Sequence, residues 1–156
     1  NTFVYKASGK QESQGFEIDL NGDITSNLSV IASYGYTTTK NKEISNKELT
    51  NVPHHTANIF ATYKLSSINL PDYYIGGGTR FIGGKYADEA NNIKLDSALI
   101  YNATVGYKKG NWRANLSVQN LTNEEYVDGA LISDARGTRV YAGTPRTFLA
   151  SVSYKF

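Results

Sequence analysis

The adjacent histidines His54 and His55 are the side chains whose chemistry first suggests a metal site. They follow Pro53 and precede a stretch of alternating apolar residues, so they lie at the start of a predicted strand. Consecutive side chains of a strand point to opposite faces, and the two imidazoles therefore cannot easily bind one ion. We expect a structural role at the rim of a sheet, and no metal.

No spacing typical of a catalytic nucleophile occurs. Ser, Asp and His are present without a Gly-x-Ser-x-Gly elbow. The absence of Cys excludes a thiolate nucleophile and a disulfide scaffold. Gly76-Gly77-Gly78 is no phosphate loop because it lies within a predicted strand and no helix follows. Small residues on a lumen-facing or twisted strand explain it better. We expect neither enzyme activity nor a cofactor.

Composition narrows the class of protein further. The 156 residues carry 16 basic and 14 acidic side chains in a mixed pattern, which gives no basic surface for nucleic acid. Twelve Tyr, six Phe and one Trp make an aromatic-rich chain. No apolar run reaches the roughly 18 residues of a membrane helix. A membrane protein is still possible, because the strands of a membrane barrel alternate apolar and polar residues and their mean hydropathy is therefore polar. The first residues, from Asn1, already resemble a strand, and we expect a piece of a longer protein.

Residues 147–156 show a clear strand pattern in the sequence. Apolar residues of one parity alternate with polar ones: Phe148, Ala150, Val152, Tyr154 and Phe156 against Thr147, Ser151, Ser153 and Lys155. Period two is typical of a strand, and a tilted strand needs about 9 to 11 residues to cross a bilayer. An apolar row that ends on a terminal aromatic residue indicates a closing strand in a lipid environment.

Similar alternation recurs through the chain and predicts seven full strands after a partial one at residues 3–8. The apolar rows run over residues 16–20, 28–36, 57–65, 73–81, 99–107, 112–118 and 148–156. Tight connections are expected near 21–27, with Asn21-Gly22-Asp23 as the turn, and near 66–72 and 109–111. Longer ones are expected at 38–54, 84–97 and 122–145, the last irregular. Long and short connections alternate, which is typical of an up-and-down meander with one tight rim and one rim of loops.

Periodicity does not say which way the apolar face points. It points inward in a soluble sandwich or lipocalin-like barrel and toward lipid in a membrane barrel. Aromatic residues on this face gather near strand ends, as in interfacial girdles: Tyr34, Tyr36, Tyr63, Tyr73, Phe81, Tyr101, Tyr107, Trp112 and Tyr154. The other face carries charge, and a lipid-facing Arg would cost about 2 to 4 kcal/mol. We therefore expect an all-β, antiparallel, transmembrane barrel segment with Arg80, Lys108 and Arg113 in the lumen, paired with Glu17 and Asp19 or with another domain.

Several segments together resemble one family. They are Gly15-Phe-Glu-Ile-Asp-Leu20, Val52-Pro-His-His-Thr56, Tyr74-Ile-Gly-Gly-Gly-Thr-Arg-Phe81, Asp88-Glu-Ala-Asn-Asn92, Val118-Gln-Asn-Leu-Thr-Asn-Glu-Glu-Tyr126, Gly143-Thr-Pro-Arg146 and Tyr154-Lys-Phe156. In this order they resemble the C-terminal barrel half of TonB-dependent outer-membrane siderophore receptors, most of all the ferrichrome or hydroxamate type. The resemblance implies a Gram-negative outer membrane and a barrel of about 22 strands, of which residues 1–156 are the C-terminal portion. The plug domain, on which the TonB complex acts, and the earlier strands would be absent.

The resemblance also implies roles for single residues. Family members bind ferric siderophore with aromatic and basic residues of external loops, and Tyr86, Tyr126, Arg139 and Tyr141 are the candidates here. A C-terminal aromatic, here Phe156, would be read by the outer-membrane barrel assembly machinery. Outer-membrane lipid would surround the wall. Two alternatives remain: a free-standing eight-stranded outer-membrane barrel with a structural or adhesive role, and a soluble β-sandwich binding protein.

Overall fold

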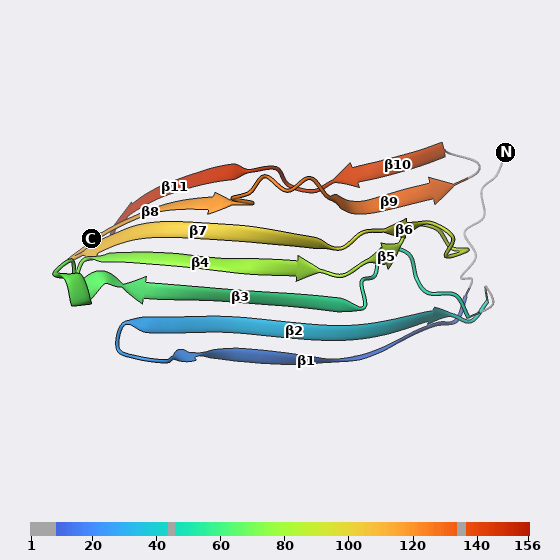
Figure 1. Ribbon diagram of the computed structural model, residues 1–156, viewed down its shortest axis with the longest axis horizontal. Helices are drawn as coiled ribbons and strands as arrows, with labels where there is room; N and C mark the ends of the chain where they lie inside the picture. The colour runs from blue at the N-terminus through green and yellow to red at the C-terminus, as the bar shows by residue number, and fades with distance from the viewer. Residues whose placement is uncertain (1–8, 44–45, 134–136) are drawn as a thin grey trace.

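A computed structural model describes residues 9–43, 46–133 and 137–156, and its main feature is one antiparallel sheet (Figure 1). The strands are β1 (Gln11–Asp23), β2 (Leu28–Asn41), β3 (His55–Lys64), β4 (Tyr73–Ile82), β7 (Ala98–Lys109), β8 (Trp112–Gln119) and β11 (Thr147–Tyr154). They are hydrogen-bonded in that order, each antiparallel to its neighbours. The seven full strands are thereby confirmed. The partial strand predicted at 3–8 lies outside the described residues.

Short and long connections lie at opposite ends of the sheet. Residues 24–27, the 3-10 helix η1 (Leu65–Ile68) with 69–72, and residues 110–111 close the inner end, where the C-terminus also lies (Figure 1). Outer loop 1 (42–54), outer loop 2 (83–97) and outer loop 3 (120–146) lie at the other end. The predicted up-and-down meander with one tight rim is confirmed.

Two of the outer loops contain strands that the sequence did not indicate. Loop 2 holds the two-residue strands β5 (Lys85–Tyr86) and β6 (Lys94–Leu95), which pair with each other. Loop 3 holds a hairpin of β9 (Val127–Ser133) and β10 (Gly137–Ala142). The prediction of an irregular segment at 122–145 was wrong. A hairpin that stands beyond the sheet has no lipid face, so its sequence need not alternate.

The first inner turn lies later than its sequence signal. Gly22 is still part of β1 and pairs with Val30, so Asn21-Gly22-Asp23 is strand and the predicted turn is misplaced. The chain reverses at 24–27, where Thr25 Oγ1 accepts the backbone N–H groups of Asn27 and Leu28 at 3.2 and 3.0 Å. A hydroxyl that satisfies two backbone donors replaces the glycine-based turn.

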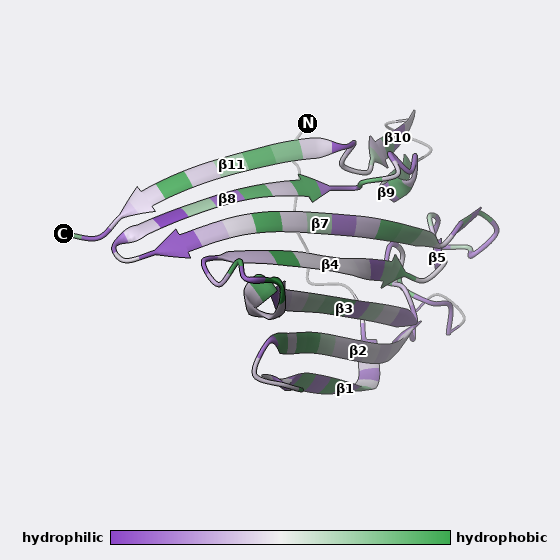
Figure 2. Ribbon diagram, turned by 60° about the vertical axis from the view of Figure 1, so that its left-hand side comes forward, coloured by the Kyte–Doolittle hydropathy of each residue, from purple (hydrophilic) through white to green (hydrophobic). Residues whose placement is uncertain are grey.

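Strand register places the apolar rows on one continuous face. Pairs such as Ala32 with Ile59 and Val105 with Leu116 connect the rows from strand to strand, and Figure 2 shows the alternation in hydropathy along them. The face is open: Ile59, Val105 and Val152 are 49%, 44% and 70% exposed. Within the described residues no second layer covers it. A sealed apolar centre, which a soluble sandwich requires, is therefore contradicted.

Packing on the opposite face of the sheet explains why β4 contains glycines. A Cβ at Gly76 would lie 2.9 Å from the ring of Phe60, and one at Gly78 would lie 2.7 Å from it. A methyl group at Gly106 would overlap the ring of Tyr74. These aromatic rings thus occupy the space over backbone that has no side chain, and this packing covers sheet that glycine would otherwise expose.

Fully buried apolar residues occur only at the outer end within the described part of the chain. Ile82, Ala98 and Ile100 are 7%, 4% and 6% exposed where β4 and β7 meet loop 2, and Ala87 and Ala130 are buried within the loops. No helix in the described segments has the length and apolar character needed to cross a membrane. The compact part of this chain is therefore the outer mouth, and the rest is a single-layered wall.

Candidate functional site

Asn51 connects loop 1 to the hairpin of loop 3. Its Nδ2 donates to the carbonyl oxygen of Ala130 at 2.8 Å, and its Oδ1 accepts the N–H of Ala130 at 2.9 Å. The amide thus pairs with the backbone of β9 as a strand residue would. Gly129 leaves room for this approach, since a Cβ there would lie 3.3 Å from Asn51 Oδ1. The backbone N–H of Asn51 also donates to Tyr86 in loop 2 at 2.8 Å.

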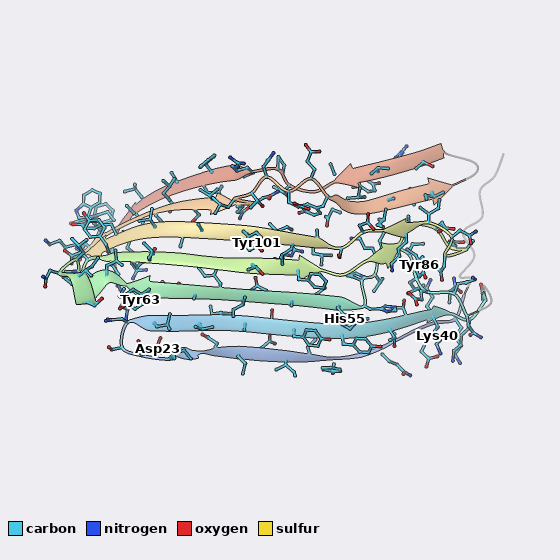
Figure 3. The ribbon with its side chains drawn as sticks, in the orientation of Figure 1. Asp23, Lys40, His55, Tyr63, Tyr86 and Tyr101 are labelled. Carbon is cyan, nitrogen blue, oxygen red and sulfur yellow. The ribbon has the colours of Figure 1, made fainter. Side chains whose placement is uncertain are left out.

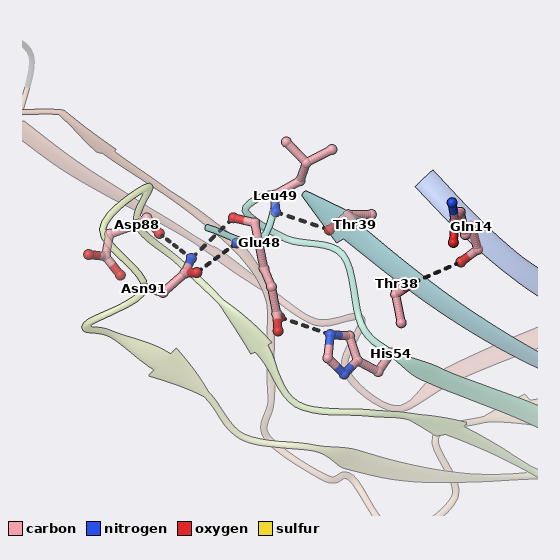
Figure 4. A network of polar contacts seen from close by, with 8 residues as sticks. All are labelled: Gln14, Thr38, Thr39, Glu48, Leu49, His54, Asp88 and Asn91. Carbon is pink, nitrogen blue, oxygen red and sulfur yellow. Dashed lines mark hydrogen bonds and ion pairs between the residues drawn. The ribbon is translucent and has the colours of Figure 1, made fainter. Parts of the chain in front are cut away.

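Asn91 connects loop 2 to loop 1 in the same way (Figure 4). Its Oδ1 accepts the N–H of Glu48 at 2.7 Å, and its Nδ2 donates to the Glu48 carbonyl at 3.1 Å. The Asp88 carboxylate accepts the N–H groups of Ile93 at 2.7 Å and Asn92 at 3.0 Å. These bonds, that of Ile93 first, hold the pKa of Asp88 below its ordinary value. The turn thus presents Asn91 to loop 1.

The two histidines point to different surroundings. His54 Nε2 lies 2.8 Å from Glu48 Oε2, at ion-pair distance but outside the alignment of a hydrogen bond. His55 Nδ1 lies 2.8 Å from the hydroxyl of Tyr34 and its ring packs 5.1 Å from that of Tyr36. No cluster of three metal-ligating side chains occurs in residues 9–43, 46–133 and 137–156. The two imidazole rings lie 6.5 Å apart and both pack against Tyr36, but their ring nitrogens face different partners, Glu48 and Tyr34.

Two buried polar side chains complete the loop assembly. Lys85, 6% exposed, donates to the carbonyl oxygen of Asp128 and so joins loop 2 to loop 3. Asn120, 1% exposed, donates to the carbonyls of Glu124 and Thr144 at 2.9 Å each and accepts the N–H of Glu124. The three outer loops are thus one connected body.

The four predicted ligand contacts all belong to this body, at different places. Tyr126 lines a cavity of about 460 Å³ between β6 and the start of loop 3, with Lys94, Asp96, Glu124 and Glu125 among its walls. Arg139 and Tyr141 are exposed two residues apart on one face of β10. Tyr86 is half-buried in β5, and its carbonyl is bound by Asn51. The structure does not place the four side chains in one pocket.

Sequence reasoning missed the asparagines that hold the loops together. Asn51, Asn91 and Asn120 have positive φ angles of 61°, 56° and 53°. Asparagine is one of the few residues that adopts this conformation at low cost. The available signal was therefore an Asn within a polar connection, and such a signal does not indicate which residue the amide will bind.

The predicted girdle residues form two groups on the apolar face. At the inner end, the rings of Tyr73 and Tyr107 lie 5.0 Å apart and those of Trp112 and Tyr154 lie 4.9 Å apart. Tyr63 lies near the same end, and Figure 3 shows Tyr63 and His55 at opposite ends of β3. Nearer the loops lie Tyr34, Tyr36 and Tyr101. The C-terminal Phe156 is fully exposed, with its ring 5.2 Å from Tyr154.

The predicted lumenal charges are on the face opposite the apolar rows, and their predicted pairing with the plug domain stays a prediction. Lys108 lies directly across from Arg113, and Arg80 lies across from Asn58 and Ile100. Within the described residues no ion pair joins these cations to Glu17 or Asp19. Glu17 and Asp19 lie on β1, an edge strand of the described sheet, whereas Arg80 lies on β4 and Lys108 and Arg113 lie on β7 and β8, so at least two strands separate the acids from the cations.

A single-layered, up-and-down sheet with an apolar outside, a polar inside and a loop assembly at one end defines the wall and mouth of a transmembrane β-barrel. Comparison with known proteins identifies the family. The family model "TonB dependent receptor-like, beta-barrel" matches residues 1–121, and the chain belongs to this family. These receptors lie in the outer membrane of Gram-negative bacteria, and this is where the chain resides.

Named relatives agree with this assignment. An uncharacterized TonB-dependent receptor of Haemophilus influenzae is 38% identical over 135 residues, covering 76% of this chain and 38% of the relative. The ferrioxamine receptor of Yersinia enterocolitica is 31% identical, over 97% of this chain and 22% of its own. The crystal structure of the siderophore receptor PiuA from Acinetobacter baumannii superposes with a TM-score of 0.79 at 26% identity, over 95% of this chain and 22% of its own. These relatives are named as receptors, not as enzymes, and this chain spans less than two fifths of their length.

Proposed function

We propose that this chain is the C-terminal part of the barrel of a longer TonB-dependent receptor for ferric siderophores, of the ferrichrome or hydroxamate type. A plug domain and earlier strands would complete a barrel of about 22 strands. Two observations support this. The chain corresponds to 22% of the ferrioxamine receptor, and within the described residues β1 and β11 pair on one side only. An unpaired strand edge in lipid costs several kcal/mol per backbone group, so further strands are needed.

The observation that carries the proposal is the connected body of outer loops at the mouth. Siderophores are bulky polar ligands, and a body braced by side-chain bonds can present contacts to them at fixed positions. Tyr126 lines a cavity of about 460 Å³ at the mouth, and Arg139 and Tyr141 present a cation and an aromatic side by side. With Tyr86 these residues are the proposed ligand contacts.

The proposed role involves no bond chemistry in this chain. The cargo would be the ferric siderophore itself, and uptake would be driven by the TonB complex acting on the plug. The wall segment would keep the lumen separate from lipid, and outer-membrane lipid would contact its apolar face. The mouth would select the cargo.

The test is alanine at Tyr86, Tyr126, Arg139 and Tyr141 together in the complete receptor. If these residues contact the cargo, affinity for ferric siderophore should fall by about tenfold or more. The measurement is titration of the purified receptor with ferrichrome and ferrioxamine. A control with alanine at Lys109 and Lys155, at the inner end, should bind normally. Unchanged affinity of the fourfold variant would refute these contacts.

A second test concerns the terminal aromatic. Phe156 is fully exposed and follows the last strand, so it is free to contact another protein. We propose that the barrel assembly machinery binds it, and Phe156→Ala should then lower the amount of receptor inserted in the outer membrane. Lys155→Ala is the neighbouring control. Normal insertion of Phe156→Ala would count against the signal.

A further inference from the structure

The hairpin of outer loop 3 has one covered edge and one free edge. On β9, the backbone N–H and carbonyl groups of Ala130 both bond to the amide of Asn51 in loop 1. Lys85 of loop 2 donates to the carbonyl of Asp128 on the same strand. The outer edge of β9 is therefore the covered one, and it faces the rest of the loop assembly.

The free edge belongs to β10. Ala130 lies across from Val140, and in an antiparallel pair two residues opposite each other point their backbone groups either both toward or both away from the partner strand. The N–H and carbonyl groups of Val140 therefore point away from β9, as do those of Thr138, two residues earlier. Among the described residues no further backbone hydrogen bond reaches either residue. All six residues of β10 are exposed, and Val140 is 60% exposed.

The composition of β10 suits a strand that pairs on both sides. Edge strands that remain unpaired are protected by Lys, by Pro or by a bulge. β10 has neither Lys nor Pro, and its one register shift lies at its end, between Tyr141 and Ala142. The residues with free backbone groups, Thr138 and Val140, are β-branched and favour strands. The edge is therefore open to a further strand.

This edge is in line with the free edge of the wall. β9 follows β8 and β10 precedes β11, and Figure 1 shows β10 on the same side of β9 as β11 is of β8. The N–H of Lys155 donates to the carbonyl of Asn111, on the β8 side, at 3.0 Å. Residues of the other parity, such as Phe148 and Tyr154, therefore point their N–H groups away from β8. Free backbone groups thus continue from the wall into the mouth.

We propose that β10 pairs with the outer loop that follows the first strand of the complete barrel, so that this loop adds a third strand to the hairpin. The inference rests on the proposed function, in which that first strand pairs with β11. Because β11 runs from the outer to the inner end, an antiparallel neighbour leaves the membrane beside β10. We call this loop, which lies outside residues 1–156, the seam loop.

The pairing would connect the loops across the seam between the last and first strands. Through β9 the seam loop would be joined to Asn51 and Lys85, and so to loops 1 and 2. Arg139 and Tyr141, the proposed ligand contacts on β10, would then be held from both sides of the hairpin.

The experiment measures hydrogen exchange at single amides of the complete receptor in detergent. The N–H groups of Thr138 and Val140 should exchange about tenfold or more slowly than their intrinsic rates, as paired groups do. A Gly-Ser linker of equal length in place of the seam loop should remove this protection. Arg139 and Tyr141, whose N–H groups point toward β9, should stay protected. The matched control is the same replacement in an outer loop on the opposite side of the barrel, which should change none of these amides.

A proline in β10 tests the pairing with the seam loop intact. Val140→Pro removes an N–H that points away from β9, so the hairpin should tolerate it. Exchange at Thr138 should rise by about tenfold, because the ladder with the seam loop loses a bond. Val140→Ala keeps the N–H and should leave Thr138 protected. Equal exchange at Thr138 in the two variants would refute the pairing, even if the loop replacement is poorly produced.

The end residues of β11 separate this inference from the proposed function. Fast exchange at Thr138 and Val140 with slow exchange at Phe148 and Tyr154 would overturn the inference and leave the proposed function standing, because the wall would close without the loop. Fast exchange at all four amides would contradict the proposed function as well. Protection of β10 that survives the loop replacement and is lost on dilution would assign the edge to a second copy of the receptor, and would also overturn the inference.

Discussion

The wall and the mouth of this chain are held together by different interactions. Along the wall, each strand pairs with the next through an unbroken backbone ladder, and this ladder continues into the turn at 24–27, where the carbonyl of Asn27 accepts the backbone N–H of Lys64 at 2.8 Å. At the mouth, loops of 13 to 27 residues are joined by single side chains, Asn51, Asn91 and Lys85, to backbone far away in sequence. The wall therefore depends on a repeated pattern, whereas the mouth depends on a few specific residues.

The largest expected effect comes from placing a charge on the lipid side of the wall. Ala32 lies on the apolar row midway along β2, across from Ile59, whereas its neighbour Ser33 faces the other side across from Asp19. Ala32→Arg should destabilise the folded barrel by about 2 to 4 kcal/mol. Ser33→Arg should cost little because Asp19 lies opposite. Urea unfolding in lipid vesicles measures both, and equal costs would contradict the assignment of faces.

Breaking one amide bridge should affect the mouth and leave the wall intact. Asn51→Ala leaves the backbone groups of Ala130 without their partner, at a cost of about 1 to 3 kcal/mol. Hydrogen exchange should speed up in 127–133 and remain unchanged in β3 and β4. Asn69→Ala is the matched control: Asn69 has nearly the same φ, 62° against 61°, but lies in an inner turn. Exchange that rises along the wall as well would mean that the two regions are not separate.

Aromatic pairing at the inner end should contribute less. Tyr73 and Tyr107 lie directly across from each other with rings 5.0 Å apart. A double-mutant cycle with Tyr73→Ala and Tyr107→Ala should give a coupling energy of about 0.5 to 1.5 kcal/mol. Tyr34 and Tyr107 lie on strands that are not neighbours, and their cycle should give about zero. Coupling of equal size in both cycles would argue against a local aromatic contact.

The smallest expected effect concerns the Asp88 turn and its dependence on pH. The N–H groups of Ile93 and Asn92 lower the pKa of Asp88, so the charged form stabilises the folded turn. This contribution is present above the ordinary carboxyl pKa of about 3.9 and is lost as pH falls through the lowered pKa. Protection of 88–93 against exchange, corrected for intrinsic rates, should therefore drop in strong acid. Asp88→Asn should remove that pH dependence, and Glu89→Gln should retain it.

The wall could be predicted from the sequence because the same alternation of apolar and polar residues repeats from strand to strand. A lipid face needs apolar residues at every second position, and the rows ending at Tyr36, Tyr107 and Tyr154 all satisfy that rule. The turn at Asn21-Gly22-Asp23 was misplaced because Gly22 continues the strand, where it pairs with Val30, and the Thr25 hydroxyl closes the turn that follows.

The mouth could be predicted only in part. Its position followed from the alternation of connection lengths. The strands β9 and β10 have no lipid face, so apolar and polar residues do not alternate in their sequences. The bridge from Asn51 to Ala130 spans 79 positions, and nothing in the local sequence of either residue indicates the other. Within the described residues the lumenal cations do not pair with Glu17 or Asp19, because charge alone does not give position along the sheet, and their pairing with the plug stays a prediction.

The orientation of the apolar face is best tested with single spin labels in lipid vesicles. The chain has no native Cys, so a single introduced Cys is its only labelling site. Nitroxides at Val30, Ile59 and Val105 should be relaxed by oxygen dissolved in lipid, and nitroxides at the polar neighbours Ser29, Asn58 and Thr104 by a water-soluble nickel reagent. Preferential relaxation by the nickel reagent at Val30, Ile59 and Val105 would contradict a lipid-facing wall.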